Sequence, residues 1–394
     1  MAKRRTSITS SRHRPRPGRR RARERKRVSR VILLLGAILG AGLLFYEELP
    51  KEEPKETLLV VPPDYSALAD TLDEVAVRAL SGLGILPDWI SRSHPKRKDA
   101  AERRIFTRTR VRVPANLPLA LCNLEVTKAV QRIGGGIIDG TENGRATKVT
   151  LTIGVRDNVT GEVILSKDLS LQRPTGKAAI IIDDFGGRDN ETSRGFLSLD
   201  RPLTIAVLPG GGGSKEIADR AHANGFEVML HLPMEPHNSL INPGKEAIFV
   251  KLTPTEVRER VRRALESVPH IRGVNNHMGS KATENEGTMG AVMAEIKKRK
   301  LFWVDSRTSQ NSVAYDVAKK AGLKAAQSRL FIDSEPDLEK IEAKLKRLYE
   351  LATAEGQVLA IGHCRPLTLQ VLRQTLPKLE KRGVTFVYAS DLVE

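Results

Sequence analysis

The sequence predicts an α/β protein: a seven- or eight-stranded (β/α) barrel, preceded by a small α+β domain and a single transmembrane helix. An uncharged apolar run follows a basic N-terminus, and a middle region mixes alternating segments with helical ones. After residue 174, short apolar runs alternate with longer helical stretches. Such alternation is typical of a parallel sheet covered on both faces, closed as a barrel or, alternatively, open and doubly wound.

Residues 1–30 are expected to form a basic, disordered tail. They hold fourteen Lys or Arg and one Glu, and so carry most of the formal charge of +18 of the 394-residue chain. A segment with almost no large apolar side chains cannot bury a core. Nucleic-acid binding is the alternative role for such a tail. Aromatic residues are only 4% of the chain, which argues against a base-stacking surface.

Residues 31–46 (VILLLGAILGAGLLFY) are predicted to be a membrane anchor. The run carries no charge, and as a helix it would span about 24 Å, with flanking Arg and Glu side chains reaching the interface. A cleaved signal peptide is the alternative, but no small-x-small site follows the run. The positive charges before the anchor predict a single-pass protein of the bacterial cytoplasmic membrane. Its N-terminus would be cytoplasmic and its C-terminal domain periplasmic or extracellular.

Residues 47–63 combine Pro with charge, as expected of a linker. Residues 64–172 then predict a small α+β domain of unassigned role, with Asp64 as N-cap of a helix that ends before Gly82. A second helix is expected at 117–133, and strands at 103–113, 148–155 and 162–171. We interpret the Gly-rich segment 133–140 as a turn rather than a phosphate loop.

Residues 177–394 carry the predicted barrel. Its strands are expected at residues 178–182, 203–208, 227–230, 273–275, 301–304, 325–332, 358–361 and 384–388. Helical stretches separate most of them; residues 254–267, for example, place Val257, Val261 and Leu265 on one face.

Polar residues follow the ends of most of these strands. They are Asp183 and Asp184, His231, His277, Asp305, Asp333 and His363. In a (β/α) barrel the C-terminal ends of the strands line one mouth, so these side chains should converge despite spanning 180 residues. Polar residues scattered through a core would not fall regularly at the ends of successive strands.

The residue types at the strand ends indicate a metal centre. Asp183 and Asp184 follow three isoleucines, which is unusual for a solvated turn, the commoner setting of adjacent aspartates. Carboxylate and neutral imidazole together suit Zn²⁺ or a similar ion with an open position for water. His231 and His277 are the candidate partners, although a lone histidine is more often a satisfied polar residue.

Five segments carry a family resemblance: IIIDDFG, HLPMEP from residue 231, GVNNHMGS from 273, FWVDSRT from 302 and AIGH from 360. Together they resemble the divergent polysaccharide deacetylases, a branch of the carbohydrate esterase barrel superfamily. The resemblance runs from about residue 177 to residue 394 and does not cover the first 170 residues.

The resemblance implies a metal site that differs from the typical one. The second Asp of the motif, Asp184, would bind the metal together with His277. Typical members supply another imidazole four residues later, where this chain has Lys281. His231 is expected to replace that imidazole, with His237 in reserve.

The resemblance also implies catalytic roles. Asp183 would be the catalytic base, His363 the general acid, and Arg307 the residue that orients the base. Substrate binding is expected of Asp305, Glu235 and Asn276.

The expected activity is therefore metal-dependent hydrolysis, with Zn²⁺ the most suitable ion, of N-acetylated or O-acetylated cell-envelope polysaccharide. The expected partners are a carbohydrate polymer and the inner membrane. The alternative is a catalytically weak barrel that binds glycan or an envelope protein. Nucleotide binding by residues 209–215 (PGGGGSK) lacks both the GK[ST] ending and the GxGxxG spacing, so this loop is interpreted as a flexible lip of the mouth.

Overall fold

The computed structural model describes residues 65–95, 97–98 and 104–394. The predicted basic tail (1–30), membrane anchor (31–46) and linker (47–63) lie outside these residues. Within the described part of the chain, no helix has both the length and the apolar character needed to cross a bilayer. The anchor therefore stays a prediction.

The N-terminal part of the described chain contains a mixed sheet with strand order β1-β4-β7-β6-β5. Its strands are β1 (Ile90–Ser93), β4 (Thr107–Pro114), β5 (Gly136–Glu142), β6 (Lys148–Val155) and β7 (Asn158–Asp168). Only β4 and β7 pair in parallel among them. A two-stranded ribbon, β2 (Arg97–Lys98) with β3 (Arg104–Ile105), and the 3₁₀ turn η1 (Pro87–Trp89) complete this part.

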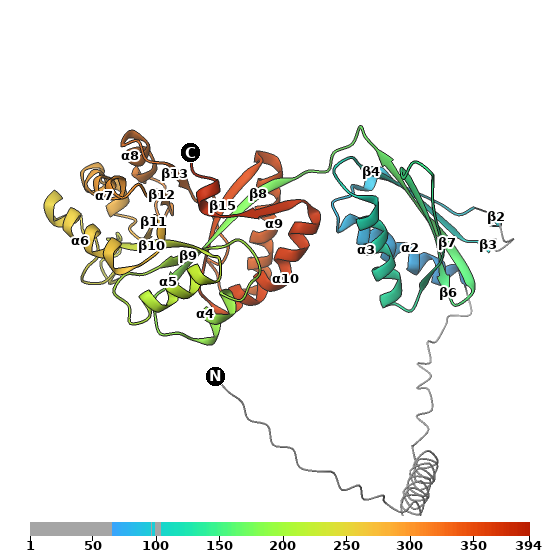
Figure 1. Cartoon of the computed structure of the whole chain (residues 1–394), viewed down its shortest axis with the longest axis horizontal. Coiled ribbons are helices and arrows are strands. Elements are labelled where there is room, and N and C mark those ends of the chain that lie inside the picture. The colour runs from blue at the N-terminus through green and yellow to red at the C-terminus, as the bar shows by residue number, and fades with distance from the viewer. Residues whose placement is uncertain (1–64, 96, 99–103) are drawn as a thin grey trace, which may run out of the picture. The chain divides into compact units, whose positions relative to one another are not determined.

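Two helices, α2 (Tyr65–Ser81) and α3 (Leu119–Arg132), pack with the mixed sheet around one apolar cluster (Figure 1). Their apolar residues recur at helical spacing, as the buried Cys122, Val126 and Val130 of α3 illustrate. The two helices and strands β4, β6 and β7 confirm the predicted elements. The predicted turn at 133–140 is wrong in its second half, because Gly136–Glu142 pairs with β6 as an edge strand.

The C-terminal part is built on nine parallel strands. They are β8 (Gly176–Phe185), β9 (Thr204–Val207), β10 (Glu227–Met234), β11 (Ile271–Met278), β12 (Phe302–Asp305), β13 (Ala325–Gln327), β14 (Leu330–Phe331), β15 (Gln357–His363) and β16 (Val384–Val387). Eight follow the order β13-β12-β11-β10-β9-β8-β15-β14, and β16 pairs with the first residues of β8. The predicted α/β class and parallel strands are confirmed.

Both faces of this sheet are buried. Along β8, Ala178, Ile180 and Ile182 belong to one apolar cluster, and Ala179 and Ile181 to another. The first cluster includes side chains from the helices between the strands, whereas the second is formed mainly by strand residues. Burial on both faces explains why the strands read as continuous apolar runs rather than as alternating ones.

Helices between the strands cover the outside of this sheet (Figure 1). They are α4 (Glu191–Phe196), α5 (Ser214–Ala223), α6 (Pro254–Ser267), α7 (Glu286–Lys298), α8 (Ala314–Lys320), α9 (Leu338–Glu355) and α10 (Pro366–Arg382). The 3₁₀ turns η2 (Ala282–Glu284) and η3 (Ala389–Asp391) complete the element order.

The strands form a half-barrel rather than the closed barrel that the sequence predicts. Within residues 104–394, β13 and β14 do not pair, so the strand path stays open between them. The sequence predicts one strand at 325–332, but Ser328 and Arg329 interrupt it. The amide of Ser328 donates to the Asp305 carbonyl (2.9 Å) and that of Arg329 to the Leu359 carbonyl (2.9 Å), so this linker bonds to strands on either side.

The Gly-rich loop 209–213 packs against the turn that follows β8. A Cβ on Gly211 would lie 2.1 Å from the Gly186 carbonyl oxygen, and a Cβ on Gly213 would lie 2.0 Å from that of Gly187. Only glycine allows such a close approach of two backbones. These glycines therefore have a packing role, which holds the turn after Asp183 and Asp184 in place.

Candidate metal centre and active site

The C-terminal ends of the parallel strands enclose a cavity of about 330 Å³. Six of the predicted site residues line it: Asp183, Asp184, His231, Asn276, His277 and His363. They come from β8, β10, β11 and β15, which are far apart in the sequence but pair in the sheet. The structure thus brings together most of the residues selected by their position at strand ends.

A local irregularity in β8 aims two consecutive carboxylates at the same cavity. Successive residues of a regular strand point to opposite faces, so Asp183 and Asp184 should diverge. The pairing of β8 with β9 shifts register between Ile182 and Phe185, and Asp184 has a left-handed φ of 68°. Such a bulge re-aims a side chain, and Asp tolerates the left-handed region better than most residues.

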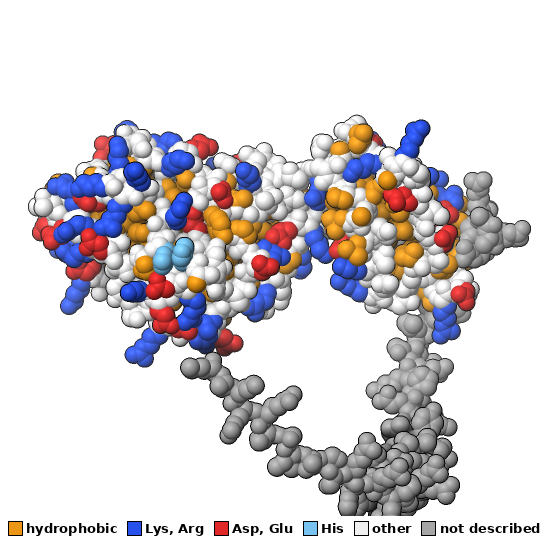
Figure 2. Space-filling view, in the orientation of Figure 1, with side chains coloured by type: hydrophobic (Ala, Val, Ile, Leu, Met, Phe, Trp, Pro, Cys, Tyr) orange, Lys and Arg blue, Asp and Glu red, His pale blue; other side chains and the backbone are white. Residues whose placement is uncertain are grey.

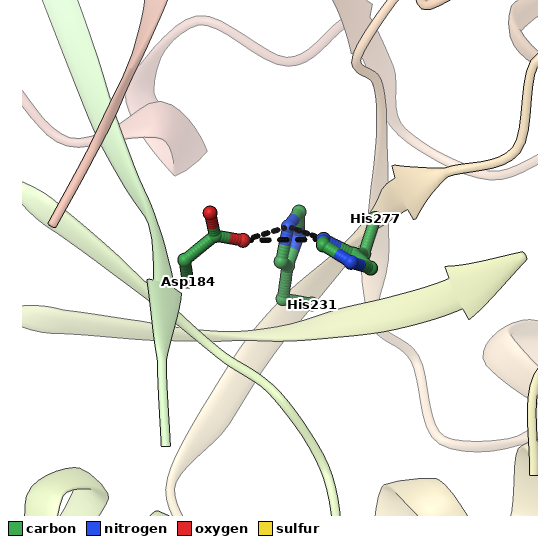
Figure 3. Close-up of side chains that lie close together, drawn as sticks. All are labelled: Asp184, His231 and His277. Carbon is green, nitrogen blue, oxygen red and sulfur yellow. Dashed lines mark hydrogen bonds and ion pairs between the residues drawn. The ribbon is translucent and has the colours of Figure 1, made fainter. Parts of the chain in front are cut away.

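Asp184, His231 and His277 bring three potential ligand atoms together, as Figure 3 shows. His277 Nδ1 lies 3.1 Å from Asp184 Oδ1 and 3.0 Å from His231 Nε2. His231 Nε2 lies 3.3 Å from Asp184 Oδ1. The three atoms form a nearly equilateral triangle.

This triangle fits a metal ion. Ligand atoms bound at about 2.0–2.1 Å to a tetrahedral Zn²⁺ lie about 3.3 Å apart, close to the spacing of these three atoms. The buried Asp184 Oδ1 also has no well-formed hydrogen bond, although two imidazoles stand beside it. A metal would satisfy this oxygen and the two ring nitrogens at once.

Asn275 supports the triad, and sequence reasoning missed it. Its Oδ1 lies 2.9 Å from His231 Nδ1, and its Nδ2 donates to Asp183 Oδ1 at 2.8 Å. Because an amide oxygen can only accept, His231 carries its proton on Nδ1 and leaves the Nε2 lone pair free for a metal. Asn275 directly precedes Asn276 in the GVNNHMGS motif, and this position is the sequence signal that could have identified it.

The charges in the cluster shift one another's pKa values. Burial raises the pKa of Asp183, against the opposing effect of the neighbouring His231. Burial would also raise the pKa of Asp184, but His231 and His277 lower it far below its usual value. For His231, burial acts to lower the pKa, yet the two carboxylates raise it overall. Asp183 is thus the carboxylate with the greater affinity for a proton.

His363 stands across the cavity as part of a separate pair. Its Nδ1 lies 2.7 Å from Asp333 Oδ1, while its backbone amide and the Thr368 hydroxyl donate to Asp333 Oδ2. Burial acts to lower the pKa of His363, but the hydrogen bond and charge of Asp333 raise it above the ordinary value. The Asp333 carboxylate therefore favours the protonated form of His363.

Three predicted residues do not line the cavity. Arg307 donates to the carbonyls of Gln310 and Ser312 in its own loop (3.2 and 3.3 Å), so it does not orient Asp183. Glu235 pairs with Lys281 (2.8 Å), where typical members have an imidazole. Asp305 is fully buried and accepts from the Ser312 hydroxyl at 2.7 Å.

Three further residues, His237, Asn276 and Arg365, differ in their position relative to the cavity: one is outside it and two line it. His237 is exposed and pairs with Glu284 (3.0 Å), away from the triad. Asn276 lines the cavity, and its side chain binds the backbone of Met278 and Ser306. Arg365 is the guanidinium on the cavity wall, with one nitrogen donating to the Asp333 carbonyl (2.9 Å). Its position after the AIGH motif could have suggested it.

Comparisons with known proteins show the family of this chain. The family model of the divergent polysaccharide deacetylases matches residues 180–393. The chain is 36% identical to the uncharacterized protein YibQ of Escherichia coli over 228 residues, which are 57% of this chain and 70% of YibQ. It is 31% identical over 204 residues to an uncharacterized protein of Haemophilus influenzae, covering 52% of this chain and 72% of that protein.

A crystal structure of an uncharacterized protein from Agrobacterium tumefaciens has a similar fold over part of this chain. Its TM-score is 0.53 at 22% identity, over 56% of this chain and 89% of that chain. The residues that the family model matches, 180–393, contain all the strand-end groups that enclose the cavity. The chain belongs to the family of divergent polysaccharide deacetylases.

Proposed function

We propose that this protein is a metal-dependent hydrolase that removes acetyl groups from N-acetylated, or O-acetylated, cell-envelope polysaccharide. The observation that carries the proposal is the triangle of Asp184, His231 and His277 ligand atoms, 3.0–3.3 Å apart at the cavity. Membership of a deacetylase family, which acts on carbohydrate polymers, supports the substrate class.

In the proposed reaction, the metal ion, Asp183 and His363 would each have a separate role. A bound divalent ion, Zn²⁺ as the best match to this ligand set, would polarise the acyl carbonyl and acidify water. Asp183, whose pKa is raised by burial, would accept the proton of the attacking water. His363, charged through Asp333, would give a proton to the departing amine, because an amide leaves poorly without one.

The proposed location follows from the N-terminal sequence. A single helix over 31–46 would hold the protein in the cytoplasmic membrane with its basic tail inside. The half-barrel would then face the periplasm or the cell exterior, where envelope polysaccharide lies. Protease treatment of intact spheroplasts tests this orientation, because the half-barrel should be cleaved while the tail stays protected.

The second candidate function is glycan binding without turnover. Lys281, bound to Glu235, stands where typical members have their second imidazole, and Arg307 is held by its own loop. A half-barrel with a weakened site would keep the metal for structure and bind the polymer at the same cavity. It predicts saturable glycan binding and no release of acetate.

Metal content of the purified full chain tests the proposal first. We expect one equivalent of metal in the parent protein and a loss of metal in Asp184→Ala, His231→Ala and His277→Ala. His237→Ala is the matched control, because this exposed histidine pairs with Glu284 outside the cavity.

Acetate release from acetylated glycans then separates the two functions. Release by the parent and its loss in the three variants would support the hydrolase. Metal without acetate release, together with glycan binding, would favour the second candidate. A parent protein without metal, or metal that persists in all three variants, would contradict both.

A further inference from the structure

A second cavity, of about 780 Å³, lies at the opposite end of the parallel strands. Arg272 is the second residue of β11, while Leu301 and Lys324 directly precede β12 and β13. These strands are parallel, so their starts lie together, away from the C-terminal ends that carry the metal triad. The volume is within the usual range for ligand sites.

The charges around this cavity are all of one sign. Five cationic residues and no acidic residue line it: Arg272, Lys297, Arg299, Lys300 and Lys324. The side chains of Phe302 and Leu323 form a buried apolar part of the wall. Figure 2 shows many Lys and Arg side chains, with Asp and Glu side chains among them, around the end of the half-barrel that carries α6 and α7.

Two of the five cations have partners within the protein. Lys297 donates to the Ala321 carbonyl (2.7 Å), and Arg299 pairs with Glu266 (3.0 Å). Among the described residues, the side chains of Arg272, Lys300 and Lys324 make no hydrogen bond or ion pair. Like charges in one concavity repel one another, so three uncompensated cations favour an external anion.

A purely structural explanation accounts for only part of this cluster. Cations near the C-terminus of a helix interact well with its dipole, and Lys297 occupies the last turn of α7. Arg272 and Lys324 belong to no helix. Lys300 has a left-handed φ of 57°, a conformation in which glycine or asparagine is the usual residue. A long cationic side chain thus occupies a position that would favour a smaller residue.

We propose that this cavity binds a phosphate group. A guanidinium and several ammonium groups are the common protein ligands of phosphate, and a phosphate can carry up to about two negative charges, which suits several cations better than one carboxylate. The phosphate could belong to a soluble molecule or to the headgroup of an anionic lipid. Both sources present the same chemistry to Arg272, Lys300 and Lys324.

Site-resolved acetylation of lysines in the full chain tests the proposal. The rates at Lys300 and Lys324 are followed by mass spectrometry with and without inorganic pyrophosphate. Lys215 and Lys245, exposed and outside the cavity, are internal controls. At about ten times the dissociation constant, mass action predicts about tenfold slower acetylation at Lys300 and Lys324, with unchanged rates at the controls.

Substitution identifies the guanidinium that contributes. Arg272→Gln should raise the pyrophosphate concentration needed for protection by about tenfold, the effect of one charged hydrogen bond. Arg262→Gln is the matched control, because it removes the same charge from the exposed surface of α6. Equal protection in the parent and the Arg272 variant would count against the site.

Vesicles separate the two sources of phosphate. Phosphatidylglycerol vesicles that protect Lys300 and Lys324 beyond Lys215 and Lys245, when phosphatidylcholine vesicles do not, would identify a lipid headgroup. Protection by pyrophosphate alone would identify a soluble phosphate. If neither protects, or if all four lysines are protected equally, the proposal is overturned.

Discussion

Two carboxylates, one in each sheet of this protein, have different surroundings. In the N-terminal part, Asp73 accepts a hydrogen bond from the Thr109 hydroxyl on one oxygen and pairs with Arg92 on the other (3.0 Å), so both of its oxygens are partnered. In the half-barrel, Asp184 Oδ1 faces two imidazole nitrogens that are themselves only 3.0 Å apart. A buried acid with donors around it holds a fold together, whereas converging ligand atoms without donors indicate a binding site.

The largest expected effect is on turnover. His363→Ala should lower kcat for amide hydrolysis by about 10²- to 10⁴-fold, because the departing amine loses its proton donor. Metal content should stay at the parent level, since His363 pairs with Asp333 and not with the triad. Acetate release and elemental analysis of the same samples check both statements. Unchanged kcat would remove His363 from the mechanism.

The next effect is on metal affinity. Asn275→Ala should weaken metal binding by about 10- to 100-fold, because His231 loses the acceptor that fixes its tautomer. Competition with a chelator of known affinity measures this change. Asn224→Ala is a suitable control, since its amide donates to the Leu197 carbonyl away from the cavity. Equal affinities in the two variants would mean that Asn275 has no supporting role.

For Asp73, the comparison predicts an effect on stability and none on metal binding. Asp73→Ala should lower the free energy of unfolding by about 1–3 kcal/mol, because the buried Thr109 hydroxyl loses its partner. Metal content and activity per folded molecule should not change. Denaturant unfolding gives the stability, and loss of metal at unchanged stability would break the distinction between the two regions.

The smallest expected effect is a shift in pH dependence. The proposed mechanism needs protonated His363, so activity should be lost as the pH rises through the pKa of that residue. Asp333 raises this pKa, and Asp333→Asn should therefore move the alkaline limb to lower pH. A pH profile of kcat checks the shift, with Asp316→Asn on the exposed surface of α8 as control. If the alkaline limb of the profile did not move, the loss of activity at high pH would belong to another group.

The sequence predicts well which side chains meet at the cavity, because the position of a residue relative to a strand end is a local property. A residue that directly follows an apolar strand must emerge at the mouth, and this places Asp184, His231, His277 and His363 without knowledge of the loops. The same periodicity predicts most strands and helices. Closure is harder, because the opening between β13 and β14 depends on backbone bonds from Ser328 and Arg329 to strands far away in sequence.

Contacts made across the sheet are the part that the sequence does not reveal. The link from Asn275 to both His231 and Asp183 needs the register of three strands. Arg307 and Arg365 both lie just beyond a strand end, yet only Arg365 reaches the cavity, since the left-handed φ of 56° at Arg307 belongs to a loop that binds its guanidinium. Loop conformation, and not residue type, decides between them.

The left-handed backbone at Asp184 has a consequence for the history and engineering of this chain. Glycine would adopt that conformation without strain, so a selection for thermal tolerance alone should favour glycine at position 184. That change would also delete the carboxylate on which the triad depends. At position 184, thermal stability therefore favours glycine, whereas the triad requires aspartate. If aspartate persisted there in a population selected for heat tolerance, selection for the function of the triad would explain it.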